Sequence, residues 1–178
     1  MMSQQRKITL LGTGLMGLPM SRNLMVAGHD LTVWNRSPER AAPLVEEGAK
    51  KTSTSAEAIE GAEIIITMLS DGYATQALLK DANFRANLSK GMIWIDMSSA
   101  KPSHARAQSS DLATLGVAHL DAPVSGGTKG AEEASLAIMA GGDQATFDAV
   151  VPVLQAMGRP VRVGPSGAGQ LCKLANQT

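Results

Sequence analysis

Residues 7–17 read KITLLGTGLMG, a short apolar run followed by three spaced glycines. The run Lys7–Leu11 contains β-branched and aliphatic residues, which predicts a buried strand that ends at Gly12. The stretch Met16–Ala27 follows as a predicted helix, and Gly28 stands at its expected C-cap. A G-x-G-x-x-G pattern between a strand and a helix is typical of a turn that binds the pyrophosphate of a dinucleotide.

The three glycines of this pattern have different expected roles. Gly12 allows the tight turn, Gly14 lets a pyrophosphate approach the backbone, and Gly17 lets the helix pack closely on the strand. The helix N-terminus adds amides and a partial positive charge. The alternative is a glycine-rich turn in an unrelated fold, but the flanking strand and helix favour dinucleotide binding. The predicted cofactor-binding turn comprises Gly12, Thr13, Gly14, Leu15, Met16 and Gly17.

The alternation of strand and helix continues along the chain. Further strands are predicted at residues 31–34, 63–68, 92–96 and 117–121, with helices at 38–47 and 102–115. This pattern predicts an α/β fold built on a doubly wound, mostly parallel sheet of the Rossmann type. We then expect a glycine-rich loop at 123–127, a strand at 135–140, a helix at 145–157 and a strand at 161–163. The dinucleotide-binding domain is expected to span residues 1–165.

The composition of the 178 residues excludes several classes of protein. Hydrophobic residues make up 44% and charged residues 18%, which is enough apolar material for a core and excludes a disordered chain. Sixteen basic and sixteen acidic residues give no net charge, and no basic run offers a nucleic acid or an anionic membrane a binding surface. No apolar segment approaches the roughly 20 residues of a membrane span, so we expect a soluble, cytoplasmic protein.

Cysteine and histidine indicate neither a disulfide nor a metal site. Cys172 is the single cysteine, which suits a reducing compartment and a packing role. The histidines His29, His104 and His119 are scattered and lack metal-ligand spacing. We therefore expect each histidine to be structural or exposed, and no metal to be bound.

The end of the second predicted strand, Trp34-Asn35-Arg36-Ser37, bears on which nicotinamide cofactor is bound. An NAD site usually has an acidic residue about 20 residues after the glycine turn to hold the ribose 2′-hydroxyl, and this sequence has none there. A carboxylate would repel a 2′-phosphate, whereas Arg36 can bind one and Asn35 and Ser37 can donate hydrogen bonds to it. We therefore expect NADP(H) to be preferred, with NAD(H) possible. The alternative for Arg36 is an exposed arginine in a turn.

Three segments of the sequence carry motifs of one enzyme family. They are residues 10–24 (LLGTGLMGLPMSRNL), 121–127 (DAPVSGG) and 167–177 (GAGQLCKLANQ). In this order they resemble the signature, the substrate loop and the catalytic helix of the β-hydroxyacid dehydrogenases. That family includes 3-hydroxyisobutyrate dehydrogenase, tartronate semialdehyde reductase and succinic semialdehyde/glyoxylate reductases. The resemblance covers nearly the whole chain.

The resemblance implies a reaction and the residues that perform it. The family reduces a small semialdehyde acid, or oxidises the matching 3-hydroxy acid, by hydride exchange with the nicotinamide. By similarity, Lys173 is the acid/base, and Asn176 or Gln177 binds substrate. The family often has asparagine at both of the last positions, so which one contacts substrate stays open. The substrate carboxylate would be held by Ser125, Gly126 and Gly127, and the cofactor would be lined by Met68, Leu69, Ser70 and Ser98.

The role of Lys173 also follows from its residue type and position. Hydride arrival at a carbonyl carbon leaves an alkoxide, which a positioned cation able to release a proton can neutralise. Lysine suits this role because burial readily lowers its pKa. On one helix, Lys173, Asn176 and Gln177 share a face. The alternative is a solvated surface lysine, which the apolar neighbours of Lys173 disfavour.

The resemblance further implies a longer protein. The family has an all-helical second domain after a linking helix, and residues 166–178 resemble the start of that helix, so we expect the chain to be truncated there. We expect the full-length protein to form a homo-oligomer, and this chain to fold, to bind NADPH and to turn over substrate poorly. An imine reductase and a cofactor-binding module without activity are the alternatives. Lys173 argues against both, and the loop 125–127 argues against the first.

Overall fold

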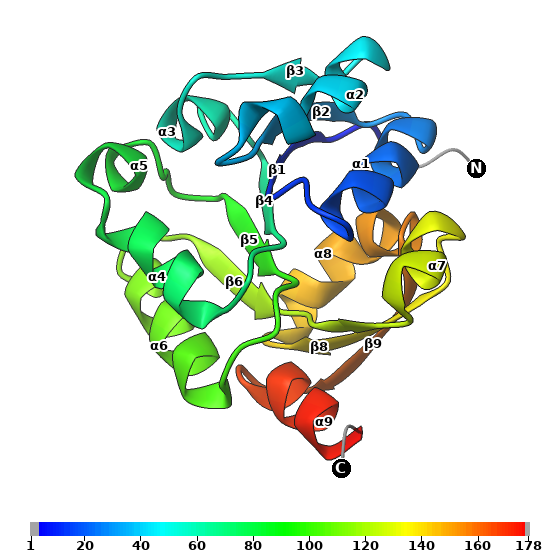
Figure 1. Ribbon diagram of the computed structural model, residues 1–178. Coiled ribbons are helices and arrows are strands. Elements are labelled where there is room, and N and C mark those ends of the chain that lie inside the picture. Colours follow the sequence, from blue (N-terminus) through cyan, green and yellow to red (C-terminus); the bar gives the residue numbers. More distant parts are fainter. Residues whose placement is uncertain (1–3, 177–178) are drawn as a thin grey trace.

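The computed structural model describes residues 4–176 as one nine-stranded sheet with helices on both faces (Figure 1). The strands are β1 (Lys7–Leu11), β2 (Asp30–Trp34), β3 (Lys50–Lys51), β4 (Ile64–Thr67), β5 (Ile93–Asp96), β6 (Ala118–Asp121), β7 (Val124–Ser125), β8 (Leu136–Gly141) and β9 (Gly158–Gly164). The helices are α1 (Gly17–Val26), α2 (Ala42–Glu46), α3 (Ser55–Ala58), α4 (Gly72–Lys80), α5 (Ala82–Ala86), α6 (Pro102–Ala113), α7 (Gly127–Glu132), α8 (Gln144–Gln155) and α9 (Ala168–Asn176), with a 3-10 turn η1 (Pro38–Arg40).

The order of the strands is that of a doubly wound sheet. It runs β3-β2-β1-β4-β5-β6-β8-β7, and β9 pairs with β8. Neighbouring strands from β3 to β6 are parallel, whereas β8 is antiparallel to both β6 and β7 and parallel to β9. The prediction of a mostly parallel α/β sheet of the Rossmann type is therefore confirmed.

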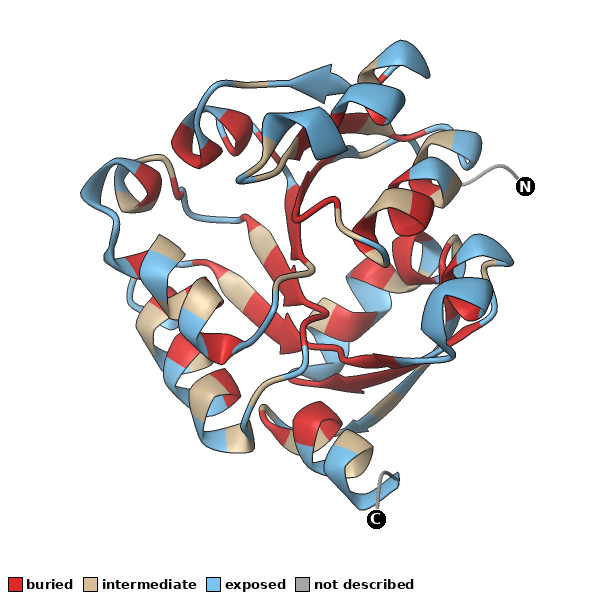
Figure 2. Ribbon diagram, viewed as in Figure 1, coloured by how far each residue is buried: buried red, intermediate tan, exposed pale blue. Residues whose placement is uncertain are grey.

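The central strands are largely buried (Figure 2). Their alternate side chains enter two hydrophobic cores, one on each face of the sheet. In β4, Ile64 and Ile66 belong to one core and Ile65 to the other. The first core lies beneath α1, α2 and α8, and the second beneath α3, α4, α5 and α6. Trp94 of β5 fills the second core and contacts Phe84 of α5, with ring centroids 5.6 Å apart. Burial on both faces explains why the sequences of these strands are nearly continuous apolar runs.

Two sequence-based predictions of elements were wrong in detail. The single helix predicted at 38–47 is η1 followed by α2, because Pro43 has no N–H to continue the hydrogen bonding across the junction. The segment 123–127, predicted as a loop, contains β7 and the first residue of α7. Val124 and Ser125 are extended because they pair with β8.

Several short elements were not predicted from the sequence, namely β3, α3, α4, α5 and α7. Three of these helices begin at a polar side chain that accepts a backbone hydrogen bond. Thr54 caps α3, Asp71 caps α4 and Asp81 caps α5. The signal for these helices was therefore their N-cap residues rather than hydrophobic periodicity, which is weak over so few residues.

Helix α9 follows β9 and packs against β6, β8, β9 and α6 (Figure 1). The helix predicted from residue 167 onward is confirmed as far as Asn176, and Gln177 lies outside the described residues. Within residues 4–176, no helix is long and apolar enough to cross a membrane.

Candidate cofactor and substrate site

Three loops meet at the edge of the sheet where the parallel strands β1, β4 and β5 end. The backbone N–H of Leu69, after β4, donates to Ser98 Oγ, after β5, at 2.8 Å. A Cβ atom at Gly12, after β1, would clash with the carbonyl oxygen of Met68. The loops are therefore in direct contact at the edge where doubly wound sheets bind their ligands.

The glycine turn has the conformation that its sequence pattern predicts. Gly12 has a φ of +105°, which is unfavourable for other residues, and a Cβ at Gly17 would clash with the Gly12 carbonyl oxygen. At Gly14 the surroundings are open, because the nearest atom to a Cβ would be Arg40 Nη1 at 3.9 Å. A side chain at this position would fill that space, so the turn leaves room for a ligand beside its backbone.

Helix α1 has a free amino end. Its N-cap, Met16, makes no capping hydrogen bond through its side chain. Among the residues that the structure describes, the N–H groups of Gly14, Leu15 and Met16 donate to no partner. These donors and the helix dipole fit the pyrophosphate of a dinucleotide.

Asn35 connects the glycine turn to the end of β2. Its Oδ1 accepts from the backbone N–H of Thr13 at 2.8 Å, and its Nδ2 donates to the Ser37 carbonyl oxygen at 3.0 Å. The side chain that was expected to face a 2′-phosphate therefore already holds two backbone groups. Asn35 occupies the place of the acidic residue of NAD sites and holds the turn in position.

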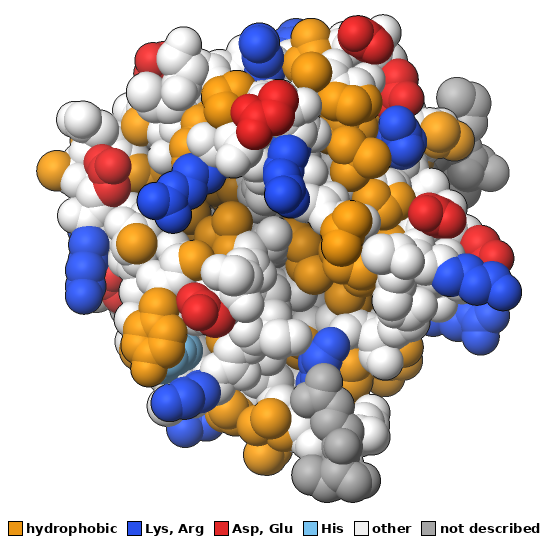
Figure 3. Space-filling model, in the orientation of Figure 1, with side chains coloured by type: hydrophobic (Ala, Val, Ile, Leu, Met, Phe, Trp, Pro, Cys, Tyr) orange, Lys and Arg blue, Asp and Glu red, His pale blue; other side chains and the backbone are white. Residues whose placement is uncertain are grey.

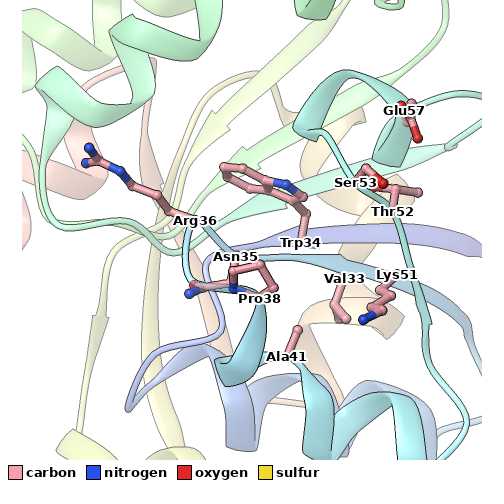
Figure 4. Close-up of a pocket in the computed structure, with 10 residues that line it drawn as sticks. All are labelled: Val33, Trp34, Asn35, Arg36, Pro38, Ala41, Lys51, Thr52, Ser53 and Glu57. Carbon is pink, nitrogen blue, oxygen red and sulfur yellow. The ribbon is translucent and has the colours of Figure 1, made fainter.

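Arg36 lies at the rim of a hollow of about 550 Å³ beside β2 (Figure 4). Its guanidinium extends away from Lys51 and Glu57, the other charged residues that line the hollow (Figure 4). Arg36 is exposed and makes no hydrogen bond or ion pair with any described residue. The long side chain is therefore free to turn toward an anion.

A second hollow, of about 610 Å³, adjoins the glycine turn and is lined by Gly14, Arg22 and Arg40 among others. Lys and Arg side chains lie above and below the depression near the centre of this face, and hydrophobic side chains flank it (Figure 3). Arg40 and Lys51 were not among the candidates from the sequence, because no motif spacing marks them. Arg40 lines the hollow beside Gly14 and Lys51 lines the hollow at whose rim Arg36 lies, which becomes apparent only when η1 and β3 fold beside the turn.

Lys173 meets the predicted substrate loop. Its Nζ donates a hydrogen bond to the carbonyl oxygen of Val124, the residue before Ser125. Partial burial lowers the pKa of the Lys173 ammonium. The Lys173 side chain is therefore held next to the loop, and its ammonium group loses a proton more easily than that of a solvated lysine.

The loop itself presents backbone and hydroxyl groups to the surface. Ser125, Gly126 and Gly127 are exposed, and the two glycines have φ angles of +135° and +62°. Asn176, one turn after Lys173, places its Nδ2 3.7 Å from Met139 Sδ on β8. The folded chain thus brings the loop 125–127, Lys173 and Asn176 to one region, although Lys173 and Val124 are 49 positions apart in sequence.

The four residues predicted to line the cofactor differ in exposure. Ser70 is exposed, and Met68 and Leu69 are half-buried. Ser98 is fully buried, and its Oγ accepts from the Leu69 N–H while its backbone N–H donates to Asp96 Oδ1 at 3.1 Å. The hydroxyl of Ser98 thus connects two loops within the protein.

Comparison with known proteins adds to this geometry. Residues 7–166 match the family described as the NAD binding domain of 6-phosphogluconate dehydrogenase. The chain belongs to this family. The match includes the glycine turn and the loop 125–127 and ends just before α9.

Relatives of this family member include named oxidoreductases. A 2-hydroxy-3-oxopropionate reductase from Escherichia coli is 40% identical over 96% of this chain and 59% of its own length. A 3-hydroxyisobutyrate dehydrogenase structure from Mycobacterium tuberculosis, described with L-serine, has a TM-score of 0.93 at 36% identity and covers 97% of this chain and 59% of its own. An imine reductase from Streptomyces aurantiacus has a TM-score of 0.87 at 28% identity, with coverages of 96% and 60%. The chain thus spans about three fifths of the length of these proteins.

The histidines and the cysteine of this family member are not among the residues that form the candidate site, although Cys172 directly precedes Lys173 on α9. His29 and His119 are buried, and burial lowers the pKa of His119 to about 4. His104 packs edge-on against Tyr73 with ring centroids 4.9 Å apart. Cys172 is half-buried and forms no disulfide. Across residues 4–176, no group of three or more His, Cys, Asp or Glu side chains is placed to hold a metal ion.

Proposed function

We propose that this chain is the cofactor-binding part of an NADP(H)-dependent oxidoreductase that acts on a small 3-hydroxy acid or the matching semialdehyde acid. 3-Hydroxyisobutyrate and 2-hydroxy-3-oxopropionate (tartronate semialdehyde) are the model substrates, because the relatives are named for them. The observation that carries the proposal is the hydrogen bond from Lys173 to the residue preceding Ser125. It brings a proton donor to the loop best suited to hold a carboxylate.

Lys173 supplies the proton chemistry in this proposal. The bound nicotinamide supplies or accepts the hydride. The Lys173 ammonium lies near the substrate oxygen, stabilises the negative charge that develops there during reduction and donates a proton to it. In oxidation, the neutral amine accepts that proton. The lowered pKa of Lys173 helps reduction because the ammonium releases its proton more easily, and it helps oxidation because more of the residue is present as the neutral amine.

The loop 125–127 binds the substrate carboxylate. Ser125 offers a hydroxyl, and the exposed backbone of Gly126 and Gly127 offers N–H groups without side chains that would obstruct an anion. Charge-assisted hydrogen bonds of this kind contribute about 1.5–3 kcal/mol each. They fix the substrate carbonyl relative to Lys173, and Asn176 or Gln177 binds a further polar group of the substrate.

NADP(H) is the preferred cofactor in this proposal, with NAD(H) also accepted. The unpaired Arg36 is available to a 2′-phosphate, and the residues 35–37 after β2 include no carboxylate to bind the ribose 2′-hydroxyl. Arg40 adds positive charge in the hollow beside Gly14, and Lys51 adds positive charge in the hollow beside β2. Glu57 is the one acidic residue that lines the hollow beside Arg36.

Replacement of Lys173 tests the reaction. In the full product of the gene, Lys173→Ala should lower kcat by about 10²–10⁴-fold, which is the usual contribution of a general acid or base, and leave NADPH affinity within twofold. Lys80→Ala, at an exposed lysine of α4, is the matched control. A Lys173→Ala enzyme that keeps most of its rate would exclude Lys173 as the acid/base. Turnover should be measured with 2-hydroxy-3-oxopropionate, methylmalonate semialdehyde and a cyclic imine.

The substrate panel also separates the alternatives. Faster reduction of the imine than of either semialdehyde would indicate an imine reductase. NADPH binding without turnover of any compound would indicate a cofactor-binding module. We expect the 178-residue chain alone to bind NADPH and to be a poor catalyst, and the full protein to be a cytoplasmic homo-oligomer.

Replacement of Arg36 tests the cofactor preference. Arg36→Ala should weaken NADPH binding about tenfold or more, because one charge-assisted contact to the 2′-phosphate is lost, and leave NADH binding nearly unchanged. Cofactor fluorescence titrations measure both constants. Arg159→Ala, at an exposed arginine of β9, controls for the loss of positive charge. An equal loss for NADPH and NADH would show that Arg36 does not recognise the 2′-phosphate.

A further inference from the structure

A cluster of buried polar groups lies at the amino end of α9. Asp121, at the end of β6, is fully buried, and the Gln170 side chain is 2% exposed. Ser98 is also fully buried. Neither Asp121 nor Gln170 is part of the proposed reaction. Burial of such groups is unfavourable unless hydrogen bonds satisfy them.

Asp121 caps α9 with both carboxylate oxygens. Oδ1 accepts from the backbone N–H of Gly167 at 2.8 Å, and Oδ2 accepts from the backbone N–H of Gln170 at 3.1 Å. The negative charge also interacts favourably with the positive end of the helix dipole. The carboxylate therefore satisfies donors that the start of a helix otherwise leaves without partners.

Two glycines allow this close approach between α9 and the sheet. A Cβ at Gly141 of β8 would lie 2.8 Å from Asp121 Oδ1 and 2.8 Å from the Gly169 backbone nitrogen. A Cβ at Gly169 would clash with the Met139 carbonyl oxygen and lie 2.7 Å from that of Asp121. The first turn of α9 is thus packed backbone to backbone on β6 and β8, with no room for movement toward the sheet.

Gln170 attaches the same turn to the cofactor loops. Its Oε1 accepts from the Ala100 N–H at 3.0 Å, and its Nε2 donates to the Ser98 carbonyl oxygen at 2.8 Å. Ser98 in turn binds the Leu69 N–H through its hydroxyl. One side chain of α9 is therefore connected to the loops after both β4 and β5.

Apolar packing holds α9 only weakly. Gly169 and Gln170 are its buried residues, whereas Leu171 is 61% exposed and Leu174 is 46% exposed. The described part of α9 buries little apolar surface. The polar contacts at its first turn therefore provide most of the interactions that hold it against the sheet. Lys173 stands three positions after Gln170, on the adjacent turn and on the same side of the helix.

We propose that Asp121 and Gln170 are positioning residues for Lys173. Asp121 fixes where α9 starts, and Gln170 fixes its rotation relative to the cofactor loops. Together they hold the Lys173 amine between those loops and the substrate loop. The catalytic meaning of this arrangement rests on the proposed function, but the positioning itself does not.

The titration of Lys173 tests the inference without an activity assay. The 178-residue chain is prepared with 13C-labelled lysine, and the Lys173 Cε signal, assigned with Lys173→Arg, is followed against pH by NMR. In Asp121→Asn and in Gln170→Met the amine should become more exposed, so its pKa should rise toward the ordinary value of about 10.4. Removal of the Asp121 charge alone would lower this pKa, so a rise reports the loss of position. Amide exchange in α9 should accelerate at least about tenfold.

Matched controls separate this effect from general destabilisation. Asp143 is the N-cap residue of α8 but makes no side-chain capping hydrogen bond, so Asp143→Asn should change neither readout. Gln155→Met, at an exposed glutamine, controls for Gln170→Met. A single cooperative urea-unfolding transition should be kept in every variant, and it shows that the chain is folded.

The outcomes distinguish this inference from the proposed function. An unchanged Lys173 pKa and unchanged exchange in α9 in both variants would overturn the positioning role. If Asp121→Asn does not fold, Gln170→Met and Gln170→Glu test the positioning role instead. Glutamate at position 170 keeps the acceptor for the Ala100 N–H but loses the donor to the Ser98 carbonyl oxygen. If Lys173→Ala keeps its activity while Asp121→Asn still shifts the Lys173 titration, the proposed function fails and the positioning role stands.

Discussion

Helices α1 and α9 both begin at glycine-rich turns on the edge of one sheet, yet their amino ends are opposite in character. At α1, the N–H groups of Gly14, Leu15 and Met16 have no partner among the described residues. At α9, the Asp121 carboxylate accepts from the backbone N–H groups of Gly167 and Gln170. We call these the open end and the closed end.

The difference shows how one physical device serves two purposes. A helix amino end favours a negative charge whether that charge comes from a ligand or from the protein. The open end leaves its donors for an external anion, which suits reversible binding of a cofactor. The closed end is filled by an internal anion, which suits the permanent placement of a side chain such as Lys173.

The largest effect is expected when the open end is closed. Gly14→Asp would place a carboxylate beside the free N–H groups, in space that is empty in the structure. We expect the affinities for NADPH and NADH to fall alike, by at least about 100-fold or about 2.7 kcal/mol, because the carboxylate repels the pyrophosphate. Cofactor fluorescence measures the loss, and Gly14→Asn controls for size. Equal losses for Asp and Asn would mean that bulk rather than charge excludes the cofactor.

The next largest effect compares one substitution at both ends. Gly169→Ala at the closed end should lower the free energy of unfolding by about 1–3 kcal/mol, because its Cβ meets the Met139 carbonyl oxygen. Gly14→Ala at the open end should change it by less than about 0.5 kcal/mol, because the nearest atom to its Cβ would be Arg40 Nη1 at 3.9 Å, an ordinary contact distance. Urea unfolding followed by circular dichroism gives both values. Equal destabilisation by the two variants would contradict the contrast between the ends.

The smallest effect concerns Asp96, a buried carboxylate next to the closed end that accepts from the backbone N–H of Ser98. Burial raises the pKa of Asp96 to about 6, above the value of about 3.9 in an unfolded chain. The folded state therefore binds more protons between these values, and its contribution to the free energy of unfolding falls as pH rises from about 4 to about 6. Asp96→Asn removes this pH-dependent fall in the free energy of unfolding, because asparagine does not ionise. The asparagine oxygen can still accept hydrogen bonds from Thr67 Oγ1 and from the Ser98 N–H.

We therefore expect Asp96→Asn to match the original chain near pH 3.5 and to exceed its free energy of unfolding by about 1–2 kcal/mol near pH 8. Urea unfolding at a series of pH values measures this difference. The lowered pKa of His119 has the opposite effect on stability, but it is present in both proteins and cancels. A difference that stays constant with pH would show that Asp96 is not buried in its charged form.

The sequence predicted most of the long elements because their signals are local. Lys7–Leu11, the glycine turn and the strands at β4 and β5 follow from apolar runs bounded by glycine or polar residues. The same reasoning joined η1 and α2 into one helix and missed α3, α4 and α5, since it weighed periodicity above Pro43 and above the caps Thr54, Asp71 and Asp81.

Individual residues of the candidate site were proposed from the sequence, but their arrangement was not. The loop 125–127 and Lys173 were each named from their motifs, whereas Arg40, Lys51, Asp121 and Gln170 were not given any role. Asp121 lies within a motif that was quoted, but its type alone does not distinguish a surface aspartate from a buried cap. Only its burial and its two bonds to α9 make that distinction.

The sequence by itself determined the open end of α1. A glycine with positive φ, two further glycines at fixed spacing and a following helix are properties of a dozen consecutive residues, so they can be inferred without the rest of the chain. The tertiary structure alone decided the closed end. Gln170 and Ser98 are 72 positions apart, and Lys173 and Val124 are 49 apart. Such contacts depend on the order and register of the strands, because these set which loops meet at the edge of the sheet.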